Sequence, residues 1–202
     1  MAEEGVELLD KPPVVESAKQ KEFSMDVEID GLPYIFKGTV PDNPEGIILS
    51  LHVPNWEKEL DKIRKKIASG EMFPGPEVNT FRLYQGRIGF INLTPHDKPA
   101  ADLHIERIRS NTWIVPKDSP YYDVHGLGRF LMNNMLTLAD VKGWSIEGSP
   151  YTDGRLTDEH VYSWLQRKGF KDNKKGELVR QPQKPDTTQS IYVCLSATEE
   201  AP

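Results

Sequence analysis

The sequence predicts an α/β fold with a mixed, mostly antiparallel central sheet flanked by helices. Apolar and polar residues alternate on both sides of Asp30-Gly31, which is typical of a β-hairpin. Apolar residues recur every three to four positions over 56–69 and 127–142, which is typical of helices with one packed face. Short strand-like segments lie between and around these helices, so a layered sheet-and-helix domain accounts for the order of elements.

The composition is that of a globular protein without a membrane-spanning segment. Of the 202 residues, 37% are hydrophobic and 28% charged, and no apolar run approaches the roughly 20 residues that a spanning helix needs. The length supports one sizeable core and is short for two. The N-terminus is acidic where a secretory signal would be basic, and the single cysteine, Cys194, allows no internal disulfide. We therefore expect one cytoplasmic domain with no membrane partner.

The net charge is acidic. It amounts to -6 at pH 7, with a pI of about 5.4. An acidic surface repels phosphate backbones and gains little from counterion release. Nucleic acid is therefore not the expected partner, whereas a cationic small molecule or protein would be attracted.

The N-terminal part is predicted to contain an arm, a hairpin, a strand and a helix. Residues 1–22 are charged and proline-containing, which indicates a flexible arm. An additional hairpin covers 23–40, and a buried strand follows at 47–53. Asn55 offers an N-cap to a helix over 56–69, which Gly70 ends.

The middle of the chain is expected to be mainly antiparallel strands. Residues 71–77 contain two prolines and a glycine and indicate a loop. Residues 78–93 are predicted to form a hairpin with its turn at Gln85-Gly86. Residues 102–116 are predicted to form one long strand with a bulge or bend at 109–111.

The C-terminal part alternates helices and strands. The helix at 127–142 is apolar over so much of its surface that it must be buried against the sheet, and Gly143 ends it. The remaining expected elements are a short strand at 144–149, a helix capped by Thr157 or Asp158 and stopped by Gly169, a polar stretch at 171–189, and a last strand at 190–196. We expect 23–202 to form a single domain.

The segment Gly126-Leu127-Gly128 opens the most apolar helix. Glycines there allow a ligand to approach the backbone, and the free N–H groups of a first helical turn attract anions. A tight turn that needs glycine only for its geometry explains the same residues equally well. The segment is not a dinucleotide-binding motif, because the third glycine of that pattern is replaced by Leu131, nor is it a P-loop.

Two motifs resemble those of the GNAT superfamily of acyl-CoA-dependent N-acyltransferases. Pro120, Tyr122, Gly126 and Gly128 match the P-x-Y-R-G-x-G-x-G turn that opens the central helix of that family, and 163–170 match its closing helix, which ends in Gly-Phe. The order of elements from Ile47 onward is also similar. The resemblance implies a GNAT-like fold, with the hairpin at 23–40 as an addition.

The resemblance also implies a binding site for acetyl-CoA as co-substrate. The backbone N–H groups of Val124, His125, Gly126, Leu127, Gly128 and Arg129 would hold the pyrophosphate. The end of the preceding strand, at Lys117, Asp118 and Ser119, would pair with the pantetheine arm.

Two positions depart from the family pattern. Asp123 places a carboxylate near the expected pyrophosphate, which weakens the site unless Arg129 or another cation compensates. Leu165 stands where the family usually has the tyrosine that protonates the departing thiolate. Tyr162, one helical turn earlier, is the candidate replacement, although a tyrosine that packs its ring and leaves its hydroxyl in water fits the position as well.

Transfer to an amine requires a base, and Glu106 on the predicted long strand is the candidate. An exposed strand carboxylate without a catalytic role is the alternative. His104 and His125 are further candidates, and His160 is a weaker one. No pair of histidines or cysteines has a metal-ligand spacing, so no metal site is expected, and Cys194 is predicted to be a buried structural thiol.

Two functions from different classes follow. The first is an acetyl-CoA-dependent N-acetyltransferase that acts on a primary amine of a small molecule or a protein, by direct attack in a ternary complex. The second is an altered or inactive domain of the same fold that serves as a binding or assembly module, with a homodimer or protein partner held by the N-terminal region. Transfer of a different acyl group is a third possibility.

Overall fold

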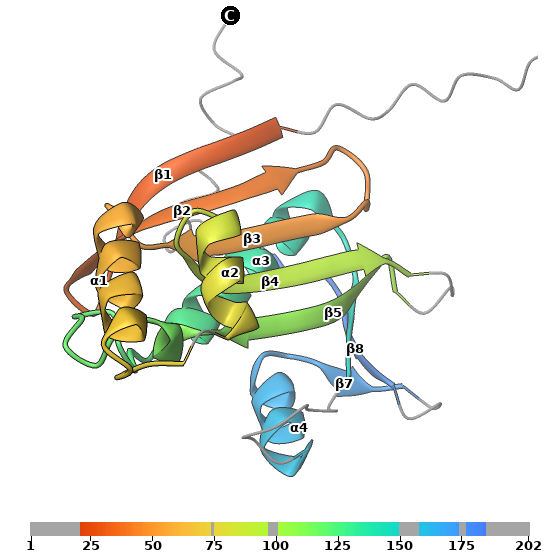
Figure 1. Ribbon diagram of the computed structural model, residues 1–202. Helices are drawn as coiled ribbons and strands as arrows, with labels where there is room; N and C mark the ends of the chain where they lie inside the picture. Colours follow the sequence, from red (N-terminus) through yellow and green to blue (C-terminus); the bar gives the residue numbers. More distant parts are fainter. Residues whose placement is uncertain (1–20, 74, 97–100, 150–157, 174–176, 185–202) are drawn as a thin grey trace, which may run out of the picture.

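The computed structural model describes residues 21–73, 75–96, 101–149, 158–173 and 177–184. These residues form one mixed sheet of eight strands with helices on both faces (Figure 1). The sheet order is β1-β2-β3-β4-β5-β6-β8-β7, and every neighbouring pair is antiparallel except β5 and β6. The predicted class, a mixed and mostly antiparallel α/β sheet, is therefore confirmed.

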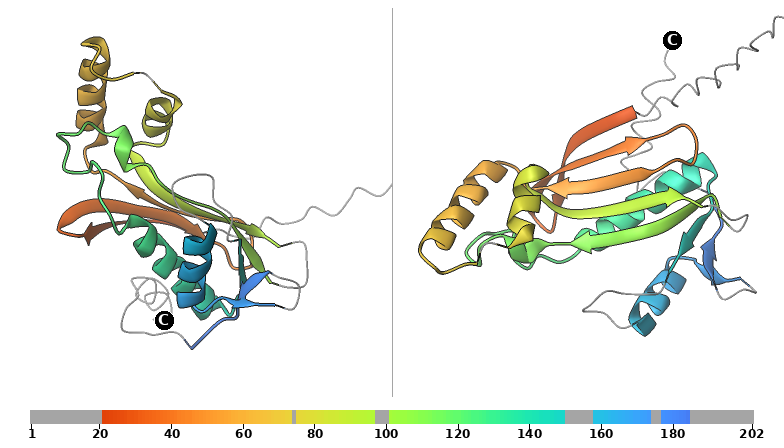
Figure 2. Two further views of the ribbon diagram at one scale, coloured as in Figure 1. Left: turned by 90° about the horizontal axis from the view of Figure 1, so that it is seen from below. Right: turned by 45° about the vertical axis from the view of Figure 1, so that its right-hand side comes forward.

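The strands are β1 (Lys21–Ile29), β2 (Leu32–Val40), β3 (Ile47–His52), β4 (Arg87–Pro95), β5 (Leu103–Ser110), β6 (Ile146–Gly148), β7 (Lys171–Asp172) and β8 (Leu178–Arg180). The helices are α1 (Trp56–Ala68), α2 (Pro76–Leu83), α3 (Leu127–Lys142) and α4 (Asp158–Arg167), with a short 3-10 helix, η1 (Thr112–Ile114). Figure 2 shows α1 and α2 on one side of the sheet and α3 and α4 on the other.

The predicted N-terminal hairpin is present. β1 and β2 pair antiparallel from Lys21↔Val40 to Ile29↔Leu32. Asp30 and Gly31 both have positive φ angles, of 51° and 77°, as a type I′ hairpin turn requires. Tyr34 and Phe36 of β2 are 1% and 0% exposed, so β2 is part of the core of the protein.

Helix α1 follows β3 as predicted. Asn55 precedes it, but with a left-handed backbone and no hydrogen bond from its side chain to the helix. Leu60 and Ile63 are buried, and Trp56 and Ile67 pack against the core. Gly70 adopts a φ of 76° directly after the helix, as a C-terminal glycine does.

The predicted hairpin over 78–93 is half wrong, because its first half is helix α2. Pro76 occupies the first helical position, where its missing N–H costs nothing, and the Thr80 hydroxyl donates to the Pro76 carbonyl. Val78 and Phe81, three positions apart, share the buried face of this helix. The second half is β4, and the turn at Gln85-Gly86 is present, with φ angles of 50° and 78°.

The predicted long strand over 102–116 is also shorter than expected. β5 ends at Ser110 and is followed by η1, whose Thr112 and Ile114 are buried. The bulge lies earlier than predicted: Asn92 pairs with Arg107 and Leu93 with Ile105, which leaves Glu106 as the extra residue.

Helix α3 has the bounds that the sequence predicts and packs against β3, β4 and β5. Gly126 and Gly143, at its two ends, have φ angles of 82° and 73°. Its buried side chains continue the single hydrophobic core to which all four helices described contribute.

The C-terminal part contains more strand than predicted. β7 and β8 arise from the polar stretch at 171–189, and β8 is buried between β6 and β7. After α4, Gly169 has a φ of 88° and the Phe170 N–H donates to the Leu165 carbonyl, a helix stop of the predicted kind. The predicted strand at 190–196, Cys194, Thr157 and nearly all of the arm at 1–22 lie outside the described residues.

Candidate functional site

The start of α3 presents free backbone donors. The first hydrogen bond of the helix runs from the Phe130 N–H to the Gly126 carbonyl, at 2.9 Å. The N–H groups of Leu127, Gly128 and Arg129 precede it and have no acceptor within the helix. A Cβ added at Gly128 would meet no atom within 4 Å. The space beside Gly128, in the first turn, is therefore open.

Two cations lie near this helix end. Arg129 is exposed in the first turn. Lys168, which follows α4, donates to the Asn133 side chain at 2.6 Å. Partial burial, and secondly the charge of Arg129, lower the pKa of Lys168. The two charges therefore repel each other, and an anion bound between them would relieve that repulsion.

Two carboxylates lie near the same helix end. Asp123, in the preceding loop, has a φ of 52° and is exposed. Asp30, in the β1–β2 turn, is close enough that a Cβ on Gly126 would lie 3.2 Å from its Oδ2 atom. The Tyr121 hydroxyl donates to the Pro33 carbonyl at 3.2 Å. The N-terminal hairpin is therefore packed against the loop that opens α3.

The sheet is open beside β5. β5 and β6 pair only at Leu103↔Ile146 and His104↔Glu147, and the next residue of β6, Gly148, pairs with β8. In the described part of the chain, β5 therefore has no strand beside it on the β6 side from 105 to 110.

This open edge leads to the start of α3. Ser110 at the end of β5 pairs with Gly89, and a Cβ on Gly89 would lie 3.8 Å from the Leu127 Cβ. The part of β5 with no described strand on its β6 side and the first turn of α3 therefore lie at the same end of the sheet.

Glu106 lies on this part of β5. It is exposed, and the Asn92 amide donates a hydrogen bond to its Oε2 atom. The bulge sets its position, because Glu106 has no partner residue in β4. The structure thus gives the candidate base a fixed hydrogen-bond partner and access from solvent.

Lys117, Asp118 and Ser119 do not extend a strand, so the expectation that they form the end of the strand before α3 is wrong. They lie in a turn after η1, in which the Ser119 N–H donates to the Pro116 carbonyl at 2.8 Å. Asp118 forms an ion pair with Lys66 of α1 at 3.4 Å. Lys66 also pairs with Glu71 at 3.5 Å, so this turn lies beside the C-terminal end of α1. The strand ends earlier because buried Thr112 and Ile114 turn the chain into the core.

Tyr162 is directed toward the outer strand of the sheet. Its hydroxyl donates to the Asp172 carboxylate of β7, and this hydrogen bond is the main cause of the raised pKa of Tyr162. Leu165 is 2% exposed and packs beneath Gly148 and Phe170. The structure therefore does not bring Tyr162 to Glu106.

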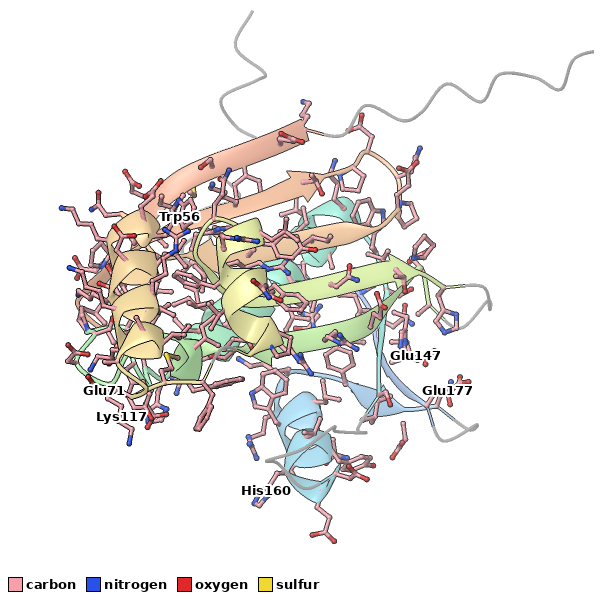
Figure 3. All side chains as sticks on the ribbon, viewed as in Figure 1. Trp56, Glu71, Lys117, Glu147, His160 and Glu177 are labelled. Carbon is pink, nitrogen blue, oxygen red and sulfur yellow. The ribbon has the colours of Figure 1, made fainter. Side chains whose placement is uncertain are left out.

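The histidine candidates separate in the structure. His125 is exposed in the loop before α3, and His160 is exposed on α4 (Figure 3). His104 instead lies beside His96 and Glu147, and the possible ligand atoms of these three residues lie within 4.8 Å of one another. The prediction of no metal site used spacing along the sequence, which cannot group residues from distant segments. The antiparallel pairing of β4 with β5 brings His96, directly after β4, close to His104 of β5.

Comparisons of the chain with protein-family models, with curated proteins and with solved structures found no match. Among the helices that the structure describes, none is long and apolar enough to cross a membrane.

Proposed function

We propose that this protein is an N-acyltransferase that moves an acetyl group from acetyl-CoA to a primary amine. The observation that carries the proposal is the open edge of β5, which leads to the free N–H groups at the start of α3. This arrangement suits a ligand that has both an amide-containing arm and a pyrophosphate. The GNAT-like motifs around Gly126 and Gly169 support the same choice of ligand.

The donor would bind along β5. The pantetheine arm carries two amides and would pair with β5 in the manner of an added strand, on the side where no described strand lies next to residues beyond His104. Glu106 and Ser110 are four residues apart, about 13 Å at the usual strand rise, which suits an extended arm. The pyrophosphate would accept hydrogen bonds from N–H groups within 124–129. Arg129 and Lys168 would offset the negative charges of Asp123 and Asp30.

Glu106 would act as the base. It would accept a proton from the ammonium group of the acceptor, and the neutral amine would then attack the thioester carbonyl. A C–N bond forms, the nitrogen of the tetrahedral intermediate gives its second proton to water, and the C–S bond breaks. CoA leaves as a thiolate, whose conjugate thiol has a pKa near 8.5, as is usual for thiols. On the sequence alone, Tyr162 is the candidate acid that protonates this thiolate. Because the Tyr162 hydroxyl donates to Asp172, water would supply the proton more readily.

The first test measures donor binding. We expect acetyl-CoA to bind the wild-type protein in a calorimetric titration, and Gly128→Leu to lower the affinity at least tenfold. The added side chain enters open space in the fold and leucine is a better helix former than glycine, so the variant should fold. Val141→Ala, at the exposed far end of α3, is the matched control. Absence of binding to the wild type at millimolar acetyl-CoA would refute the proposal.

The second test measures chemistry. In an assay of thiol release against a panel of amines, Glu106→Gln should lower kcat by about 100-fold or more while acetyl-CoA affinity is unchanged. Tyr162→Phe is measured beside it. A comparable loss in that variant would restore Tyr162 as the acid, whereas an unchanged rate would assign the proton to water. Equal rates for wild type and Glu106→Gln would exclude Glu106 as base.

A second candidate function, a binding or assembly module without catalysis, is favoured by the carboxylates of Asp30 and Asp123 at the start of α3. Both would oppose an anionic donor. Under this function acetyl-CoA does not bind, and the partner, which includes a second copy of the chain, contacts the N-terminal hairpin. Sedimentation tests this second function by comparing the wild type with Asp26→Lys, which reverses one exposed charge on β1. Deleting the whole hairpin would be uninformative, because β2 is part of the core.

A further inference from the structure

Three possible metal ligands come together where the two parts of the sheet join. His96 follows the last residue of β4, His104 is the second residue of β5, and Glu147 is the middle residue of β6. His104 and Glu147 are paired neighbours in the parallel ladder. The His96 N–H donates to the Asp102 carbonyl at 3.1 Å, which fixes the backbone of His96 beside the start of β5.

The three side chains converge on one small volume. The His104 Nδ1 atom lies 3.4 Å from the Glu147 Oε1 atom, and the His96 Nε2 atom is in direct contact with Glu147 Oε2. The side chains of His96, Glu147 and His104 are 9%, 13% and 31% exposed. The cluster is therefore mostly shielded from water and is reached from the side of His104.

The spacing suits a tetrahedral metal ion. Ligand atoms about 2.0–2.1 Å from zinc, at tetrahedral angles, lie about 3.4 Å from one another. The distance between His104 and Glu147 already has this value, and all three candidate ligand atoms lie within 4.8 Å of one another. Small rotations of the imidazoles would complete the set, and the metal would replace the direct contact between His96 and Glu147.

We propose that His96, His104 and Glu147 bind a zinc ion that ties β4, β5 and β6 together, with water as the fourth ligand. Two imidazole nitrogens and one carboxylate oxygen are a ligand set for zinc, whereas magnesium and calcium select oxygen ligands. The site lies where only two residue pairs connect β5 to β6. A bound ion therefore joins the two parts of the sheet at their narrowest connection.

The metal-free protein has another contact at this junction. Asp102 Oδ2 accepts hydrogen bonds of 2.7 Å from both the backbone N–H and the hydroxyl of Ser145. This contact links the starts of β5 and β6 without the ion. The chelated protein should therefore stay folded, which allows the metal to be titrated into it.

The experiment titrates Zn²⁺ into the chelator-treated full chain by calorimetry. We expect one ion per chain, and at least tenfold weaker binding in His104→Asn and in Glu147→Gln. His160→Asn is the matched control, because His160 lies on α4 apart from Glu147 (Figure 3), and it should bind as the wild type does. Cobalt should give the visible absorption of a tetrahedral ion in the wild type and not in the two ligand variants.

Thermal unfolding of the wild type alone tests the site without depending on whether the variants fold. Zn²⁺ should raise the midpoint of thermal unfolding, because a ligand of the folded state stabilises it in proportion to its saturation, and equal concentrations of Mg²⁺ should not. No equimolar binding of Zn²⁺ to the wild type, or equal binding by wild type, His104→Asn and Glu147→Gln, would overturn the proposal. Acetyl-CoA titrations do not bear on it, since the zinc site does not depend on the proposed acyl transfer.

Discussion

The two parts of the sheet differ in how they are held together. β1 to β5 form an antiparallel ladder in which β1 and β2 alone share nine residue pairs. β6, β7 and β8 contain three, two and three residues, so few backbone bonds connect them. The N-terminal part therefore relies on its ladder, whereas the C-terminal part relies on side chains. Both candidate sites lie near the junction of β5 and β6, where the pairing of the two strands ends after two residue pairs.

Side chains hold the C-terminal part in two ways. Leu165 and Phe170 fill the space over Gly148, where an added Cβ would lie 3.2 Å from each. Arg180 of β8 makes two hydrogen bonds of 2.7 Å to the Asp140 carboxylate of α3 and one of 3.0 Å to the Lys168 carbonyl. One buried guanidinium thus joins β8, α3 and the end of α4.

The largest effect is expected from Arg180→Ala. The two charged side chains are 5% and 10% exposed, so the substitution leaves the Asp140 carboxylate buried and unpaired, which costs about 3–5 kcal/mol. Chemical denaturation measures the loss. Hydrogen exchange should show faster opening of β6 and β8 than of β2 to β4.

The control for Arg180→Ala replaces both partners with apolar residues. The double variant Arg180→Met with Asp140→Leu should lose less stability than Arg180→Met alone, because no charge remains buried. Uniformly faster exchange across all strands in Arg180→Ala would contradict the distinction between the two parts of the sheet.

The next effect compares two glycines of the N-terminal part. Gly86 and Gly31 have φ angles of 78° and 77°, so alanine at either position costs about 1–2 kcal/mol in backbone strain. A Cβ at Gly86 would lie 2.3 Å from the Trp56 Cβ, whereas one at Gly31 meets nothing within 4 Å. Gly86→Ala should therefore lose about 1–3 kcal/mol more than Gly31→Ala.

Denaturation of both variants isolates this steric difference, since the backbone strain is nearly the same in the two. If Gly86→Ala and Gly31→Ala lost equal stability, α1 would have to move away from β4 at little cost. The N-terminal part would then be less rigid than its strand pairing suggests.

The smallest effect concerns pH. Burial is the main cause that lowers the pKa of His52, which lies between a Ser50 hydroxyl at 2.9 Å and the Gln85 carbonyl at 3.1 Å. The unfolded state therefore binds a proton more readily than the folded state. The stability due to neutral His52 is complete above about pH 6.5 and declines as the pH falls below it.

Denaturation between pH 7 and pH 5 should show this decline, at no more than about 1.4 kcal/mol per pH unit for one proton. His52→Gln should lose that part of the slope, whereas His160→Asn, on exposed α4, should keep it. An unchanged slope in His52→Gln would assign the acid sensitivity to another group.

The elements predicted correctly are those whose signals are local. The Asp30-Gly31 turn, α1, α3 and their terminal glycines depend on backbone conformation and apolar spacing over a few residues. Helix α2 was missed because its eight residues carry little periodicity and follow a proline-rich loop. β7 and β8 were missed because strands of two and three residues are set by their neighbours in the sheet.

In the candidate site, too, local features were predictable and features that depend on distant contacts were not. The glycine turn at the start of α3 and the exposure of Glu106 could be predicted from the sequence. The expectation that Lys117 to Ser119 end the strand was wrong, because the end of β5 depends on the buried residues of η1. The approach of Asp30 to Gly126 joins residues far apart in the chain, and no local pattern could have indicated it.

Local patterns in the chain are enough to specify the class of fold, the hairpin turn and the principal helices, because apolar periodicity and positive-φ residues act over short distances. Which strands are neighbours depends on tertiary packing. This arrangement leaves β5 without a described strand on its β6 side beyond His104, places the Asp30 carboxylate beside the start of α3, and brings His96, His104 and Glu147 together. These features depend on packing between distant segments, for which the free energy comes from the whole core and not from any one stretch of sequence.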